Sequence, residues 1–312
     1  MRYPLTLISL LLAVLAAAPA WAQYNRTAGK SAPAATVESV RVVDRESGDV
    51  RFEERQVEVK EDSYGNAAGS QYDLAVDGAF VGQTIVVVQL FNFDFSRPKA
   101  ALEKKGFSVY RFTGAPEPAE LEKALKKANQ FWLVSDCYGQ RLDKRHVKVI
   151  QKFFDAGHGV YIWGDNDPCY ADANFVASRM FDTKMEGDLP GDQVVTFRTK
   201  YNQSGLLQDH LLSTGVENMY EGVTIATIQE NDVLTPFLWG SAGNLVAAFY
   251  DRNGKRAILD GGFTRLYYKW DTAGTDRYVT NAAAWLANYE RFGDAVVAEQ
   301  FKAPKNETPV KR

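Results

Sequence analysis

Two patterns of apolar residues divide the chain. Over residues 37–42 and again over 55–60, apolar side chains recur at close to every second position, which predicts half-buried strands. The pattern changes at 85–88, where four β-branched residues follow one another without interruption, as is typical of a strand covered on both faces. The chain is therefore predicted to hold a small β extension over 37–80 and a larger α/β domain over 83–292.

Strand and helix segments alternate at short intervals along this larger domain. A helix is expected to begin near Ser96 and to end at Gly106, because glycine suits the turn that follows a helix. Strand, helix, strand units with short turns favour parallel pairing through right-handed crossovers. The predicted fold class is α/β, with a doubly wound, mainly parallel sheet of the flavodoxin-like type. Further strands are expected at 107–112, 131–136, 159–163, 222–228, 245–250 and 256–260, further helices at 119–128, 143–156, 171–181 and 278–289, and a polar connection over 182–210.

The two ends of the chain differ in composition from the predicted domains. Residues 1–22 are predicted to be a signal peptide, because Arg2 precedes an apolar run that closes on the small-residue pattern Ala20-Trp21-Ala22. No later stretch approaches the roughly 20 apolar residues that a membrane helix needs, so no membrane span is expected after signal removal. We expect a periplasmic or secreted protein, with a disordered lead-in at 23–36 and a C-terminal tail at 293–312.

The charges are spread along the chain. The formal net charge is -3, and lysine and arginine are interleaved with aspartate and glutamate. A nucleic-acid partner would call for a concentrated basic face, so none is expected.

The two cysteines follow two successive predicted strands. Cys137 comes directly after Asp136, and Cys169 comes shortly after the strand that ends near Trp163. If these strands are neighbours in the sheet, their carboxyl ends lie about 5 Å apart, which brings both thiols within bridging range. In an oxidising compartment the pair is expected to form a disulfide, with a reactive thiol and a metal ligand as alternatives.

Four local patterns, in this order, resemble the class I glutamine amidotransferase-like fold. The resemblance is to its non-amidotransferase branches, such as the ThuA-type trehalose-utilisation proteins and the related domain of intraflagellar-transport proteins. The second pattern is similar to the family's His-Pro-Leu-x-x-Gly segment, with Leu211 where proline is usual. The patterns are DAGHGVYIWGDN (155–166), DHLLSTGVENMYEG (209–222), GKRAILDGGFTRLYY (254–268) and RYVTNAAAWLAN (277–288).

The sequence departs from the catalytic members of that superfamily at the nucleophile. They need a cysteine at a sharp turn between strand and helix, where its thiolate lies beside backbone N–H donors and a histidine base. Here the residues after Trp163 are Gly164 and Asp165, Cys169 comes a few residues too late, and no His-x-Glu pair follows. We therefore expect no glutaminase activity and assign no catalytic residue. The resemblance implies the fold rather than the chemistry.

Acidic, amide and aromatic side chains gather just beyond the predicted strand ends. Ligands of doubly wound sheets bind there, outside the carboxyl ends of the strands, which we call the rim. Carboxylates and amides bind the hydroxyls of a sugar while aromatic rings stack on its apolar face. The ligand-binding candidates are Asp94, Asp136, Gly164, Asp165, Asn166, Asp167, His210, Asp260, Tyr267, Tyr268 and Trp270, with Asn92, Tyr138, Trp163 and Tyr170 also at strand ends.

Each candidate also has a simpler explanation. Aspartate and asparagine after a strand are favoured as helix caps and turn formers, and the aromatic residues could fill the core beneath loops. His146 and His158 are expected at the surface. Asp165, Asp167 and Asp172 could gather a Ca²⁺ ion, but their spacing lacks the later glycine and glutamate of the EF-hand loop, so no metal or other cofactor is expected.

Two functions of different classes remain open. The missing nucleophile favours a non-enzymatic exported domain whose rim binds a carbohydrate, a peptide or an envelope protein. The alternative is a periplasmic hydrolase with a non-cysteine site, in which Asp165 or Asp167 works with His210. That alternative requires these side chains within about 3 Å of the groups they serve, or roughly twice that through one water.

Overall fold

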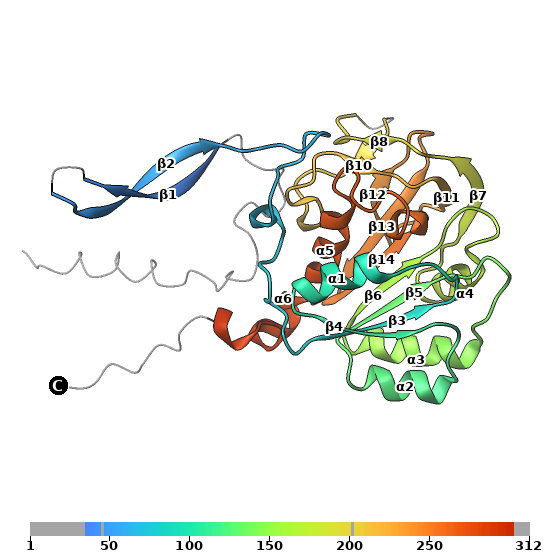
Figure 1. The fold of residues 1–312 in the computed structure, drawn as a ribbon. Helices are drawn as coiled ribbons and strands as arrows, with labels where there is room; N and C mark the ends of the chain where they lie inside the picture. The colour runs from blue at the N-terminus through green and yellow to red at the C-terminus, as the bar shows by residue number, and fades with distance from the viewer. Residues whose placement is uncertain (1–34, 45–46, 201–202, 303–312) are drawn as a thin grey trace, which may run out of the picture.

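The computed structural model describes residues 35–44, 47–200 and 203–302 (Figure 1). Its centre is an eight-stranded sheet in the order β4-β3-β5-β6-β14-β13-β12-β9. The first five strands of this order run parallel, and β13, β12 and β9 add to the sheet antiparallel. The bounds are β3 Thr84–Gln89, β4 Ser108–Phe112, β5 Gln130–Val134, β6 Gly159–Trp163, β9 Gly205–Leu206, β12 Thr235–Trp239, β13 Leu245–Arg252 and β14 Lys255–Asp260. The predicted fold class, α/β with a doubly wound and mainly parallel sheet, is confirmed.

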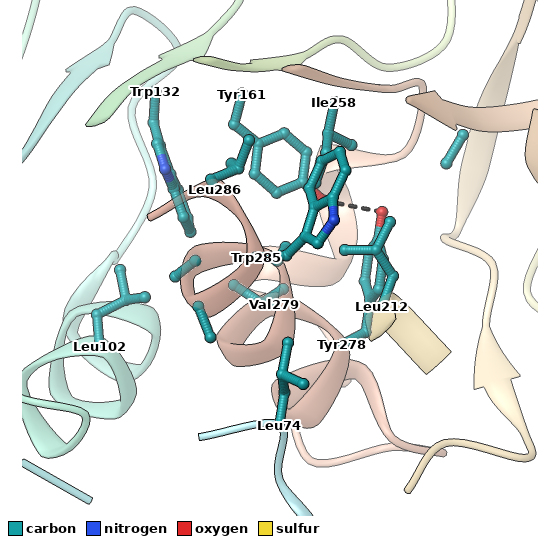
Figure 2. Packing of buried hydrophobic residues seen from close by; sticks show 14 of the residues in the cluster. Leu74, Leu102, Trp132, Tyr161, Leu212, Ile258, Tyr278, Val279, Trp285 and Leu286 are labelled. Atoms are coloured by element: carbon teal, nitrogen blue, oxygen red, sulfur yellow. Dashed lines mark hydrogen bonds between the residues drawn. The ribbon is translucent and has the colours of Figure 1, made fainter. Parts of the chain in front are cut away.

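Helices cover both faces of this sheet. Alternate residues of β3 enter two separate apolar clusters: Ile85 and Val87 pack on the side of α1 and α5, while Val86 and Val88 pack on the side of α2, α3 and α4. Figure 2 shows Trp132, Tyr161 and Ile258 directed from the sheet toward Trp285 of α5. The helix bounds are α1 Ser96–Lys104, α2 Pro118–Leu125, α3 Lys144–Asp155, α4 Ala171–Met180, α5 Thr275–Leu286 and α6 Tyr289–Phe292.

The segment expected to be a polar connection, residues 182–210, holds short strands. β7 (Met185–Pro190) pairs with β11 (Thr224–Ile228), and β8 (Val194–Val195) pairs with β10 (Met219–Tyr220). β9 and β12 join the central sheet. β7, β8 and β9 escaped prediction because β7 exposes most of its side chains, and β8 and β9 have only two residues each, too few for a periodic pattern.

The β extension begins with a hairpin. β1 (Ala35–Val43) pairs antiparallel with β2 (Val50–Glu58), and Figure 1 shows the hairpin standing away from the α/β body. β1 starts inside the range 23–36 that was expected to be a disordered lead-in. The chain then returns to the body, where the Leu74 N–H donates to the side chain of Asn281 at 2.8 Å.

Residues 293–302 also differ from the expected tail, because they pack against the body. η4 (Gly293–Val296) and η5 (Glu299–Phe301) are short 3-10 helices, and the Ala298 N–H donates to the carbonyl of Ala79 at 2.8 Å. The buried apolar run at 296–298 explains the docking. The predicted signal peptide and residues 303–312 lie outside the described residues, and no helix within the described ranges could cross a bilayer.

Candidate functional site

The rim is built from the loops that follow β3, β5, β6 and β14. The Gly164 N–H donates to the carbonyl of Asp260 at 2.8 Å, so the backbone after β6 stays beside the end of β14. A Cβ at Gly164 would lie 2.4 Å from the sulfur of Met185. Glycine at this position therefore allows the loop after β6 to pack closely against β7.

Asp165 is fully buried between two of these loops. Its two carboxylate oxygens accept from different backbone groups, Oδ1 from the Asn166 N–H at 2.9 Å and Oδ2 from the Thr264 N–H at 2.8 Å. Burial raises the pKa of this carboxyl to about 7. Asp165 thus ties the loop after β6 to the loop after β14.

The simpler explanation of a turn-forming residue before a helix holds for Asp94, whereas Asp165 caps no helix. The Asp94 carboxylate accepts from the Ser96 N–H at 2.9 Å and from its hydroxyl at 2.8 Å, just where α1 begins. These hydrogen bonds lower the pKa of Asp94. α4 instead begins at Ala171, after Tyr170, which makes no side-chain cap.

Asp260 forms a buried ion pair with Arg265. Both side chains have zero exposure, and Nη2 of Arg265 lies 2.9 Å from Oδ1 of Asp260. The same nitrogen donates to the Glu221 carbonyl at 2.8 Å, while Oδ2 of Asp260 accepts from the Tyr278 hydroxyl at 3.1 Å. Burial raises the pKa of Asp260. Its oxygens are engaged inside the protein, so Asp260 supports the rim rather than facing a ligand.

Sequence reasoning missed two members of this buried network, Arg265 and Glu221. The Glu221 carboxylate is fully buried and accepts from the N–H and the hydroxyl of Ser241, at 2.5 and 2.6 Å. Glu221 thereby fixes the turn between β12 and β13 against the loop after β10. No periodic pattern marks either residue, because Glu221 is fixed by Ser241 and Arg265 by the Glu221 carbonyl as well as by the nearer Asp260.

The predicted disulfide is confirmed. Cys137 and Cys169 are joined, with 3.9 Å between their Cα atoms, and they connect the loops after β5 and β6. The neighbouring Asp136 is also buried, and its Oδ2 pairs with Nε of Arg141 at 2.6 Å. Asp172 of α4 accepts from the backbone N–H groups of Arg141 at 2.7 Å and Leu142 at 2.8 Å. Asp136 and Asp172 therefore both fix the loop after β5.

Five aromatic rings cluster at the rim, with Phe263 buried beneath the other four, and we call them the aromatic rim. Phe93 stacks on Tyr267 with 4.5 Å between ring centroids, and Phe91 lies 6.4 Å from Tyr138. Tyr138 is 80% exposed and Tyr267 36%. Burial, together with the negative charge of Asp165, raises the pKa of Tyr267. The members are Phe91, Phe93, Tyr138, Phe263 and Tyr267.

Phe91 and Phe93 were not among the candidates. They stand at alternate positions immediately after β3, a signal in the sequence that could have found them. Among the predicted residues, Asn166 lies at the rim, where its Oδ1 accepts from the Thr224 hydroxyl at 2.7 Å. Asp167 is exposed and accepts from the Tyr170 hydroxyl at 2.9 Å.

Trp270 and Tyr268 lie outside the aromatic rim. Trp270 is buried in the core on the α5 side, which is the simpler explanation offered for it. Tyr268 is half exposed beside the ammonium of Lys269, which also contacts Asp192 and lies 5.0 Å from the ring centroid of Tyr220. Tyr268 belongs to this separate surface cluster.

His210 lies half-buried among aromatic rings on the α5 side of the sheet. It stacks on Phe249 with 4.4 Å between ring centroids and meets Trp285 at 5.6 Å, and its Nδ1 accepts from the Leu212 N–H. Burial, with the charge of Arg256 near the start of β14, lowers the pKa of His210 to about 4. Asp165 lies beyond the other end of β14. The structure does not bring His210 together with Asp165, so the predicted pair is not assembled.

The expectation that His146 lies at the surface is wrong, and His158 is half-buried. His146 is buried in α3, where its Nε2 contacts the Pro116 carbonyl at 2.8 Å. His158 stacks between Phe153 and Phe292, with centroid distances of 4.6 and 5.2 Å. Both imidazoles pack between neighbouring elements. Because histidine is polar, nothing in the sequence indicated this packing.

The segment 61–78 leaves the aromatic rim uncovered. It packs instead on α5 and on the loop before β10, where Asn66 accepts from the Glu217 N–H at 2.7 Å and Asp73 pairs with Arg277 at 2.8 Å. Within the described residues, no three histidine, cysteine, aspartate or glutamate side chains gather as a metal-ligand set. The site therefore consists of an open row of rings above buried acids.

No family model matches this chain, and the search of curated proteins found no relative. Among solved structures, it is similar to a GMP synthase subunit from Thermoplasma acidophilum (TM-score 0.42, 10% identity, covering 67% of this chain and 96% of that one). It is also similar to PurLQS from Thermotoga maritima (TM-score 0.39, 13% identity, covering 66% of this chain and 100% of that one). A third similar structure is Agd3, a carbohydrate deacetylase (TM-score 0.42, 14% identity, covering 68% of this chain and 33% of that one). The chain thus spans about a third of the deacetylase. These are likenesses of fold alone.

Proposed function

We propose that this chain is an exported, non-catalytic domain of the ThuA-like branch of the class I glutamine amidotransferase-like superfamily. We propose further that it binds a carbohydrate on the aromatic rim. One observation carries the proposal: two tyrosine rings, Tyr138 and Tyr267, are exposed at the carboxyl end of a doubly wound sheet. Ligands of such sheets bind at this end.

The chemistry around the rings suits a polyol. Exposed or half-exposed polar side chains surround them, including Asn92 and Asp94 after β3, Asn166 after β6 and Arg141 after β5. Ring faces stack on the C–H face of a sugar, while carboxylates and amides pair with its hydroxyls. A peptide or an envelope protein is a second class of ligand that the same test would reveal.

The absence of catalysis rests on the turn after β6. Gly164 and Asp165 occupy the position of the superfamily's nucleophile, and the sulfur of Cys169 is held in the disulfide. A disulfide sulfur supplies no thiolate for attack on a carbonyl. Both oxygens of Asp165 accept backbone hydrogen bonds, so the role of this carboxyl is structural.

The hydrolase alternative has one observation in its favour. The pKa of Asp165, about 7, would suit a general acid or base at neutral pH. A hydrolase would also need a partner group within reach of Asp165, and His210 does not supply it. Turnover of any glycoside or ester that is abolished by Asp165→Asn would establish the alternative.

Export is supported by two features. The leader has the pattern of a signal peptide, and the disulfide is of a kind that persists in an oxidising compartment. We therefore assign the protein to the periplasm or to the secreted fraction.

The test is a screen of immobilised glycans with the mature protein, followed by calorimetry on any glycan that binds. Tyr138→Ala should weaken binding by about tenfold, the usual scale for a lost stacking contact. Tyr110→Ala, which removes an exposed tyrosine from β4, is the matched control and should bind like the wild type. Equal binding by the two variants would reject the aromatic rim as the site, and retention of a peptide or protein in place of any glycan would reject the carbohydrate.

A further inference from the structure

The last described segment of the chain has a shallow contact with the body. We call residues 289–302 the strap; it comprises α6, η4 and η5. Only the run 296–298 of the strap is buried. The Ala298 N–H donates to the Ala79 carbonyl at 2.8 Å, and Nε2 of Gln83 donates to the Ala295 carbonyl at 3.1 Å. Segments with few buried apolar contacts open at a lower free energy than the core, so the strap can open while the body stays folded.

One imidazole of the body, that of His158, lies directly beneath the strap. It stacks between Phe153 of α3 and Phe292 of the strap, with centroid distances of 4.6 and 5.2 Å. Its Nδ1 is buried and has no hydrogen-bond partner among the described residues. A neutral imidazole can leave Nδ1 without a proton, whereas a protonated one has an N–H at both nitrogens. Protonation of His158 would therefore create a buried donor without an acceptor.

The strap also brings a positive charge to His158. Arg291 packs over Gly157, the residue before His158, so closely that a Cβ at Gly157 would clash with its side chain. Burial, together with the charge of Arg291, lowers the pKa of His158. The docked strap therefore favours the neutral imidazole.

The acidic side chains of the elements packed around His158 are engaged elsewhere, and none of them pairs with it. At the end of α3, Asp155 pairs with Lys255 at 2.9 Å. In the strap, Glu290 pairs with Arg256 at 2.6 Å, and Asp294 accepts from the Tyr289 hydroxyl at 3.2 Å. The end of α5 and the loop before β5 contribute uncharged residues to the contact, Ala287 and Asn129. Within the described residues, no carboxylate compensates a protonated His158.

A cavity of about 60 Å³ adjoins the imidazole, between the body and the strap. One water needs roughly 10–15 Å³ of such space, so the cavity can admit water, and with it a proton, while the body stays folded. The cavity is lined by Asn129, His158 and Ala287 of the body and by Phe292, Ala295 and Val296 of the strap.

We propose that the strap is a pH-sensitive latch, which is released from the body when His158 is protonated. Release removes Arg291 and Phe292 from the imidazole and exposes it to water, which hydrates the cation. Since the docked state disfavours the proton, docking is strongest above the ordinary histidine pKa of about 6.5 and weakens as the pH falls below it.

Release would change the face of the molecule at the amino end of β6. It uncovers the apolar surface beneath residues 296–298 and removes two hydrogen bonds from the segment 74–83 that leads into β3. The aromatic rim lies beyond the carboxyl end of β6 and includes no residue of the strap. The latch is therefore independent of the proposed carbohydrate site.

Hydrogen exchange followed by mass spectrometry measures the opening of the strap in the mature protein. After correction for intrinsic exchange rates, the protection of residues 289–302 should fall by about threefold or more between pH 8 and pH 5, while β5 keeps its protection. Equal protection of the strap at both pH values overturns the proposal. A loss of protection that includes β5 does so as well, because the whole body would then open.

Replacement of the imidazole tests the role of His158. His158→Phe keeps a ring between Phe153 and Phe292 but takes up no proton, so its strap should be equally protected at both pH values. Lys302→Gln is the matched control, because it removes a charge of the strap whose partner is Glu299, and its strap should open in acid as in the wild type. Acid opening of the strap in His158→Phe would assign the titration to another group and overturn the proposal.

Titration of the wild-type imidazole by NMR decides the case in which His158→Phe fails to hold its strap even at pH 8. The signal of His158 should titrate below the ordinary histidine pKa of about 6.5, over the same pH range in which the strap loses protection. An imidazole that titrates at the ordinary value, or in a range separate from strap opening, overturns the proposal.

Discussion

The loops of the rim and the β1–β2 hairpin show two opposite ways of treating polar and apolar groups. At the rim, carboxylates with zero exposure are fixed by backbone N–H groups and by one arginine, as at Asp165 and Asp260. In the hairpin, Phe52 is 69% exposed, and among the described side chains Glu53 pairs with its neighbours Arg51 and Arg55 on the same strand. Buried polar networks determine one loop arrangement because each broken contact is costly, whereas exposed ion pairs such as those of the hairpin contribute little.

Removal of Arg265 should lower the free energy of unfolding more than any other substitution considered. Arg265→Met leaves the Asp260 carboxylate buried without its cation, so the free energy of unfolding should fall by about 3–5 kcal/mol. Urea denaturation measures this. Arg97→Met is the matched control, because the Arg97–Asp271 pair is largely exposed and should contribute about 1 kcal/mol or less. Similar losses in the two variants would contradict the structural role of the buried pair.

Asp165 should make the stability depend on pH in a defined direction. Its pKa is about 7 in the folded state and near 3.8 when unfolded, so the folded state holds the proton more tightly between these values. Raising the pH through this window ionises a buried carboxyl, and the free energy of unfolding should decrease by on the order of 3 kcal/mol from pH 5 to pH 8.

A comparison with Asp165→Asn isolates this contribution. The pKa of His210 is lowered to about 4, so His210 acts oppositely, with stability gained as the pH rises from about 4 to about 6.5. Asp165→Asn should be less stable at low pH, since its amide nitrogen cannot accept from a backbone N–H, but the difference from wild type should shrink toward pH 8. A difference independent of pH between 5 and 8 would show that Asp165 does not titrate there.

The smallest effect is expected in the hairpin. Phe52→Asp should change the free energy of unfolding by less than about 0.5 kcal/mol, because Phe52 packs against little within its own chain. Urea denaturation of the variant beside the wild type measures this. A loss of several kcal/mol would mean that the hairpin packs against its own body after all.

Sequence reasoning succeeded where burial leaves a local pattern. β3 and β6 were predicted within a residue or two, because strands covered on both faces have unbroken apolar runs, and the disulfide followed from two cysteines at neighbouring strand ends. It failed where the reason is tertiary. Arg265 is buried only because Asp260 and the Glu221 carbonyl meet it in three dimensions, and His210 lost its candidate role because Phe249 and Trp285 enclose it.

The disulfide has a consequence for where this protein can work. Together with the Asp165–Thr264 hydrogen bond, it links the loops after β5, β6 and β14 into one continuous frame beneath the exposed tyrosines. In the reducing cytoplasm the chain would lack the disulfide. The loops that carry the aromatic rim would then be held less rigidly. Under the proposed function, oxidation after export would complete the binding surface.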